Sequence, residues 1–301
     1  MNINLEDISV FKHLGLLARK QVEGFITGLH QSPFHGFSVE FAEHRIYNPG
    51  ESTRHIDWKV FAKTDRLYTK RYEEETNLRC YVLLDVSGSM FYPQDSHLKI
   101  RFSALAVACL LQLFQKQRDA FGIATFSDQI HFQSPLKSTG THLNQLISVL
   151  EKTVTHPAYS NQTIVSKAIQ TIADQVGRRA MVIVFSDMFE QENIEEVFLA
   201  LRNLKHNKHE VLVFHTIDKS TEFDFSFENR PYEFIDMETK EKVKLHPVQI
   251  RQQYQEKMKK LMFDIYEKCA QYKIDLIECD VRQSVDQILM PYLVKRTKML
   301  V

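Results

Sequence analysis

The sequence predicts an α/β fold in which a mostly parallel central sheet is covered by helices on both faces. Two apolar runs, Arg79–Asp85 and Arg179–Asp187, have the composition of fully buried strands, and each ends on an aspartate. A helix that is apolar nearly all round follows the first run at Leu98–Arg118. Buried strands that alternate with helix-period segments are typical of a parallel sheet between two helical layers. We therefore expect the two aspartate-ending strands to lie side by side.

The remaining elements continue this alternation to the end of the chain. Strands at 120–126 and 129–133 are joined by Ser127-Asp128, which predicts a hairpin. Further strands are expected at 210–217 and 274–279, and helices at about 143–153, 164–176, 194–205, 248–272 and 285–293. Residues 219–246 interrupt the pattern with short strand-like pieces, which indicates a hairpin-bearing insertion.

The first 78 residues have a different character and predict a separate N-terminal unit. Helix-like sequence runs to about Leu29, and strand-like pieces follow around 37–41, 45–47 and 67–72. We interpret residues 1–78 as a helix plus a small β-rich subdomain, and residues 79–301 as the larger domain.

Composition excludes several classes of function for the chain as a whole. With 301 residues and 44% hydrophobic residues, the chain can bury a large core. Lys plus Arg and Asp plus Glu both number 38, so no global charge attracts nucleic acid or an anionic membrane. Four widely spaced cysteines form no C-x-x-C pair, which favours reduced, buried thiols over a zinc site or a disulfide framework.

The sequence also favours a cytoplasmic location. The first seven residues show no basic region followed by an apolar core, so we expect no secretory signal. The longest apolar-rich run, Phe102–Phe114, is shorter than the roughly 20 residues of a membrane-spanning helix. We interpret this run as part of a buried helix.

A candidate metal site begins where the first buried strand ends, at Asp85-Val86-Ser87-Gly88-Ser89. One carboxylate and two hydroxyls at alternate positions can turn their oxygens toward one point if Gly88 lets the loop curl tightly. Hard cations such as Mg²⁺ bind oxygen ligands of this kind. The carboxyl edge of an open α/β sheet is also where ligand sites form.

Further ligands must come from other loops. Asp187 ends the second buried strand, and Thr163 stands where a helix is expected to begin. Thr163 has the simpler alternative of capping that helix through its hydroxyl. Thr139 and Thr141 are rival suppliers, although they follow the predicted hairpin.

This combination resembles the metal-ion-dependent adhesion site of von Willebrand factor A domains. The resemblance implies that Ser87, Ser89 and Thr163 contact the metal directly, while Asp85 and Asp187 act mainly through water. It also implies a von Willebrand factor A-like sheet and a bound Mg²⁺ or Mn²⁺. In the family a glycine usually precedes the threonine, but here Asn161-Gln162 stands in its place. The assignment of Thr163 as a ligand therefore departs from the family pattern.

A narrower resemblance covers nearly the whole chain. The segments Tyr47–Glu51 and Arg54–Lys59 resemble the signature of the bacterial family called domain of unknown function 58, and 289–296 resembles its C-terminal end. Glu51 stands where the family often has aspartate. Proteins of this family typically accompany MoxR-type AAA+ ATPases, so the resemblance implies such an ATPase as partner. From the residues alone, Arg54, Asp57 and Trp58 can equally form a packed ion pair that is purely structural.

We therefore expect a metal-dependent protein-binding module rather than an enzyme. Neutral hydroxyl ligands would leave the ion enough charge to recruit an Asp or Glu carboxylate of a partner protein. A metal-dependent hydrolase or phosphatase that uses the same site is the alternative, because Asp95 and His97 follow the motif closely. One feature disfavours this alternative. Phosphatases with an Asp-x-Asp motif have a second carboxylate at the position where this chain has Ser87.

Overall fold

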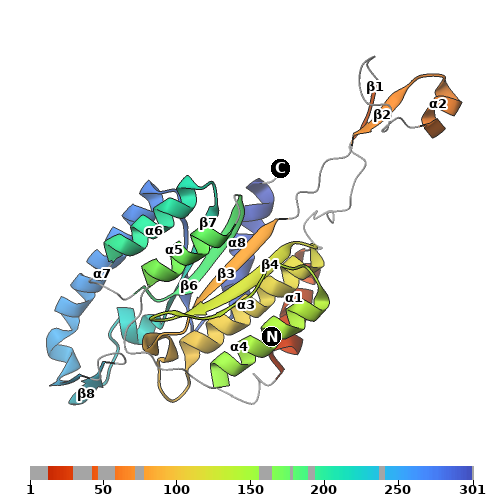
Figure 1. Ribbon diagram of the computed structural model, residues 1–301. Helices are drawn as coiled ribbons and strands as arrows, with labels where there is room; N and C mark the ends of the chain where they lie inside the picture. Colours follow the sequence, from red (N-terminus) through yellow and green to blue (C-terminus); the bar gives the residue numbers. More distant parts are fainter. Residues whose placement is uncertain are drawn as a thin grey trace. The chain divides into compact units, whose positions relative to one another are not determined.

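The computed structural model describes residues 13–29, 43–46, 58–71, 78–155, 165–176, 179–188, 194–236 and 241–299 (Figure 1). The chain forms two compact units, one made of Leu29–Asn77 and the other of Met1–Gly28 together with Leu78–Val301. We expected the first 78 residues to form one unit. The structure instead groups helix α1 (Leu14–Leu29) with the larger unit.

Helix α1 belongs to the larger unit because its apolar stripe is buried there. Leu14, Ala18 and Val22 are fully buried within the larger hydrophobic core. Their spacing of four residues places them on one face of the helix. The backbone N–H of Leu14 also donates to Oε1 of Glu151 on helix α4 (Gly140–Thr155), 3.1 Å away.

A six-stranded sheet forms the centre of the larger unit, in the order β10-β7-β6-β3-β4-β5. These strands are β3 (Arg79–Asp85), β4 (Ala120–Phe126), β5 (Ile130–Gln133), β6 (Ala180–Ser186), β7 (Glu210–Ile217) and β10 (Asp275–Asp280). Neighbouring strands are parallel except β4 and β5, which form the predicted antiparallel hairpin. The expected pairing of the two aspartate-ending strands is confirmed, since β3 and β6 are direct neighbours.

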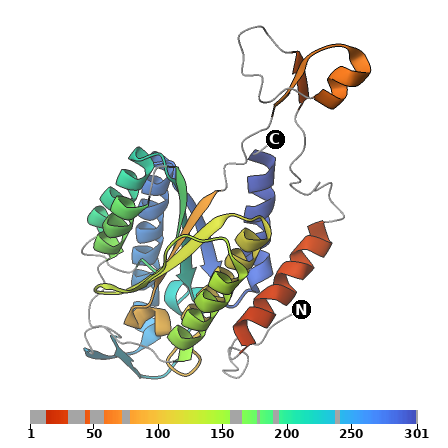
Figure 2. The same ribbon diagram turned by 45° about the vertical axis from the view of Figure 1, so that its right-hand side comes forward.

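Helices cover both faces of this sheet (Figures 1 and 2). One face packs against α1, α3 (Leu98–Lys116), α4 and α8 (Val285–Met299). The other packs against α5 (Val165–Gln175), α6 (Ile194–His206) and α7 (Pro247–Gln271). Alternate residues of each central strand point to opposite faces, so both faces must be apolar. This requirement explains why β3 and β6 are continuous apolar runs.

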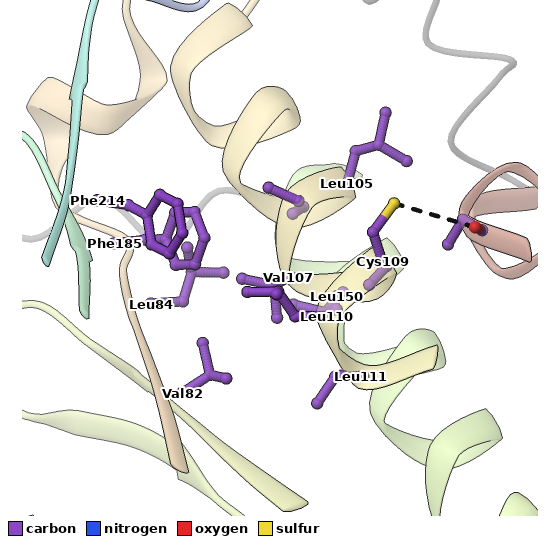
Figure 3. Packing of buried hydrophobic residues seen from close by; sticks show 14 of the residues in the cluster. Val82, Leu84, Leu105, Val107, Cys109, Leu110, Leu111, Leu150, Phe185 and Phe214 are labelled. Atoms are coloured by element: carbon purple, nitrogen blue, oxygen red, sulfur yellow. Dashed lines mark hydrogen bonds between the residues drawn. The ribbon is translucent and has the colours of Figure 1, made fainter. Parts of the chain in front are cut away.

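The larger core lies between the sheet and α3. Figure 3 shows Val82 and Leu84 of β3 facing Val107 and Leu110 of α3. Helix α3 is long and apolar enough to cross a membrane. However, 89% of its most apolar 18-residue stretch is buried inside the protein. The prediction that it is a buried core helix is confirmed.

The predicted insertion after β7 contains a hairpin. Segment η4 (Lys219–Phe223) leads to β8 (Tyr232–Ile235), which pairs antiparallel with β9 (Lys242–Leu245). The Phe225 ring stacks on that of Phe234 in β8, and the Phe227 ring meets both of them edge-on.

In the smaller unit, β1 (Glu43–Ile46) pairs antiparallel with β2 (Tyr68–Arg71), close to two of the predicted strand-like pieces. Helix α2 (Trp58–Thr64) lies between them in sequence and was not predicted. Trp58 is 62% exposed and presents its ring edge-on to Phe61. The expected strand at 37–41 and the side chains of Arg54 and Asp57 lie outside the described residues.

Candidate metal centre

The candidate metal centre lies at the point where the strand order of the sheet reverses. From β3 the chain crosses through α3 to β4 on one side, whereas β6 lies on the other side and continues through α6 to β7. Helices α3 and α6 cover opposite faces. Crossover connections that diverge in this way leave a crevice outside the carboxyl ends of the two central strands. Asp85 ends β3 and Asp187 directly follows β6.

Both carboxylate oxygens of Asp85 accept hydrogen bonds. The backbone N–H of Ser87 donates to Oδ1 at 2.9 Å, and the Ser186 hydroxyl donates to Oδ2 at 2.7 Å. Asp85 is buried, and burial followed by the negative charge of Asp187 raises its pKa to about 7. Asp85 is therefore a weaker acid than a solvated aspartate, because it is removed from water and lies near a second carboxylate.

The two motif serines lie side by side in the loop after β3. Ser87 precedes a short 3-10 turn, η3 (Gly88–Phe91), and Ser89 lies within it. Their hydroxyls share a hydrogen bond of 3.1 Å, in which either can be the donor. Adjacent ligand oxygens of an octahedral Mg²⁺ lie about 3.0 Å apart when each is about 2.1 Å from the ion. The separation of the two hydroxyls thus matches one edge of such an octahedron.

Asp187 is held by two neighbours from other elements. The ammonium of Lys99 in α3 contacts its Oδ2 at 2.6 Å, and Nε2 of His215 donates to its backbone carbonyl at 2.8 Å. Lys99 also contacts Oε1 of Glu222 in η4 at 2.7 Å. Burial alone would lower the pKa of Lys99, but these two carboxylates raise it above its usual value. Lys99 is therefore a fully buried ammonium held between two acids.

Sequence reasoning missed three residues of this site: Lys99, Ser186 and Glu222. Lys99 did carry a signal, because it is one of two basic residues at the start of an otherwise apolar helix. A buried charge in such a position requires a partner. Glu222 carried none, because it lies in the irregular insertion 35 positions after Asp187 in sequence.

The structure separates the rival threonines from this edge of the sheet. The Thr139 hydroxyl accepts the backbone N–H of His142 in the first turn of α4. The His142 ring in turn contacts the carbonyl of Phe121, near the amino end of β4. Phe126, the partner of Asp85 in the sheet, is five residues further along, or about 16 Å at the rise of a strand. Thr139 and Thr141 are thus at the wrong edge, and Thr163 lies outside the described residues.

The residues present fit a divalent cation. Asp187 and Glu222 share the Lys99 ammonium, and Asp85 lies close enough to Asp187 to feel its negative charge. A divalent ion would balance the negative charge that these acids carry when ionised. The oxygen donors, carboxylate and hydroxyl, are those that Mg²⁺ and Mn²⁺ prefer. Within the described ranges, no group of three or more His, Cys, Asp or Glu side chains could hold a metal.

The solved structures to which this chain is similar include the conserved hypothetical protein BatB from Bacteroides thetaiotaomicron. It shares 15% identity with a TM-score of 0.46, and the match covers 73% of this chain and 99% of that one. An aerotolerance-related membrane protein from Bacteroides fragilis matches with 15% identity and a TM-score of 0.44, over 70% of this chain and 99% of its own.

Curated relatives include the uncharacterized proteins Rv1480 of Mycobacterium tuberculosis and Mb1516 of Mycobacterium bovis. Each is 21% identical over 210 residues, which is 70% of this chain. The chain spans 65% of the length of these relatives. The model of the family described as protein of unknown function DUF58 matches residues 43–262, from β1 into α7, and the chain therefore belongs to this family.

Proposed function

We propose that this chain is a von Willebrand factor A-like, metal-dependent protein-binding module. The observation that carries the proposal is the pair of serine hydroxyls, Ser87 and Ser89, 3.1 Å apart beside the buried carboxylate of Asp85. In this proposal the serines and Thr163 bind one Mg²⁺ or Mn²⁺ directly, and Asp85 and Asp187 bind it mainly through water. The metal site is then a metal-ion-dependent adhesion site.

Such a site favours an acidic partner. Ligands that are mostly neutral hydroxyls leave much of the charge on the ion, and an external Asp or Glu carboxylate can complete its coordination shell. Association with the partner would then require the ion as well as the surrounding protein surface.

We propose a MoxR-type AAA+ ATPase as the partner, with this chain as its adaptor or co-chaperone. The chain belongs to the family, and an ATPase partner of this type is what the resemblance of its sequence to that family implies. The chemistry of the site adds the requirement that the ATPase present an exposed carboxylate.

Co-purification tests the proposal directly. The MoxR-type ATPase from the same genome should bind the wild-type chain in Mg²⁺ and not in EDTA, and should not bind Ser87→Ala in either. Thr141→Ala is the matched control, since it removes an exposed hydroxyl at the opposite edge of the sheet. Equal capture of wild type and Ser87→Ala would contradict a metal-mediated contact.

We propose binding rather than catalysis because both oxygens of Asp85 are engaged in hydrogen bonds. His97, a candidate in the hydrolase alternative, packs its ring edge-on against Phe91. A panel of phosphatase and nucleotidase substrates with Mg²⁺ separates the two functions. Metal-dependent turnover that Asp85→Ala abolishes would establish the hydrolase instead.

A further inference from the structure

Lys99 is the one feature of the site that a metal-binding role does not require. Its ammonium is completely buried and lies 2.6 Å from Asp187 and 2.7 Å from Glu222. A buried cation this close to a metal site repels a second cation, so its presence should weaken metal binding. An explanation is needed for a residue that opposes the ion.

The second acid, Glu222, is held firmly where Lys99 meets it. Its Oε2 accepts the backbone N–H of Asp218 at 2.7 Å, and its carbonyl accepts the Tyr254 hydroxyl at 2.8 Å. Asp218 in turn forms a two-pronged ion pair with Arg282. Glu222 is therefore a fixed carboxylate that shares one ammonium with Asp187.

We propose that Lys99 keeps the ion open to an external carboxylate by holding the Asp187 carboxylate back from direct contact with it. Without the ammonium, the Oδ2 that Lys99 now engages would be available to the metal. A second carboxylate in the shell would cancel the charge of the ion and fill a position that a partner needs. With Lys99 present, the ion binds more weakly but keeps its charge and its exchangeable waters. This inference rests on the proposed function. It identifies Lys99 as the residue that gives the metal site its preference for external acids.

The test uses Mn²⁺ as the probe, because the relaxation of water protons reports how many exchangeable waters a bound Mn²⁺ retains. Lys99→Met should bind Mn²⁺ about tenfold more tightly or better, since a like charge has been removed from the neighbourhood of the ion. Its bound Mn²⁺ should also relax water less than the ion in wild type does. Added acetate should lower the relaxivity of the wild-type complex and leave that of Lys99→Met unchanged.

Two further variants keep the test decisive. Lys219→Met removes an exposed lysine of η4 and should match wild type in affinity and relaxivity. Lys99→Met combined with Glu222→Gln removes one charge of each sign, which protects folding. It releases Asp187 alone and should bind Mn²⁺ more tightly than wild type, with lower relaxivity.

The outcomes separate this inference from the proposed function. Wild type that binds Mn²⁺ with the same affinity and relaxivity as both Lys99 variants would overturn the inference and leave the proposed function standing. Wild type that binds no Mn²⁺ would overturn the proposed function and the inference with it.

Discussion

The Ser186 hydroxyl donates to Oδ2 of Asp85 across 2.7 Å and so ties the ends of β6 and β3 together. In the proposed site Ser186 need not contact the ion, because its effect is to orient the Asp85 carboxylate, which binds the ion through water. Loss of a residue that orients a ligand typically costs 10- to 100-fold in metal affinity. We expect Ser186→Ala to weaken Mg²⁺ binding by about this factor, as measured by calorimetry.

Ser134→Ala is the control for this prediction. It also removes a buried serine hydroxyl, which accepts the backbone N–H of Ile123 in the middle of β4. We expect Ser134→Ala to lower stability and leave metal affinity unchanged. If both variants bound Mg²⁺ like wild type, the Ser186 contact would have no role in the site.

The sequence predicted the fold closely because continuous apolar strands are stable only inside a sheet that helices cover on both faces. The runs that became β3 and β6 lack interior polar residues, so they had to be covered on both faces. Asp85 and Asp187 could then be placed at one edge, since parallel strands end together. A partner for a buried Lys99 could be expected, but its identity could not be predicted. Lys99 and Glu222 are 123 residues apart, and only the folded path of η4 brings them together.

Gly122 of β4 occupies a tightly packed position on the sheet, where a larger side chain would clash with its neighbours. A Cβ at this residue would lie 2.9 Å from the Ser134 hydroxyl and 3.1 Å from both the Pro135 carbonyl and the Tyr81 ring. We expect Gly122→Ala to lower the free energy of unfolding by about 1–3 kcal/mol, as seen for overpacked cores. Chemical denaturation measures this change.

Gly24→Ala provides the comparison. A Cβ on this exposed helical glycine of α1 meets nothing within 4 Å. Alanine is favoured over glycine in a helix, so this variant should gain about 0.5–1 kcal/mol. A Gly122→Ala protein as stable as wild type would show that Tyr81 and the segment after β5 can shift without cost to admit a methyl group.

His209 makes stability depend on pH. It is buried, and burial lowers its pKa below the ordinary value of 6.5. Its Nδ1 accepts the backbone N–H of Ala180, which a protonated Nδ1 cannot do. Because the folded pKa is the lower one, the unfolded chain binds more protons between the two values. The contribution to stability is complete above pH 6.5 and is lost as pH falls through this window.

His209→Asn isolates that effect, since the amide oxygen can still accept the Ala180 N–H. We expect the free energy of unfolding to fall less in the variant than in wild type between about pH 7.5 and about pH 5. Parallel pH profiles for the two proteins would show that His209 does not titrate on unfolding.

Arg251 of α7 anchors the insertion. Its guanidinium donates to the carbonyls of Phe225 at 3.1 Å and Phe227 at 2.9 Å. Arg251→Met should speed amide hydrogen exchange in residues 224–235 while exchange in β3 and β6 stays slow. Gln252→Met, which loses only an exposed contact with Glu256, should exchange like wild type. Unchanged exchange in Arg251→Met would mean that the aromatic stack alone holds the segment.

Calorimetric titration of Mg²⁺ into wild type and into Asp85→Ala tests the metal centre most directly. The Asp85 carboxylate, at the end of β3, accepts hydrogen bonds from Ser87 and Ser186, and it is central to the proposed ligand set. We predict that wild type binds one ion and that Asp85→Ala binds it at least about tenfold more weakly. Identical heats for the two proteins would contradict the account.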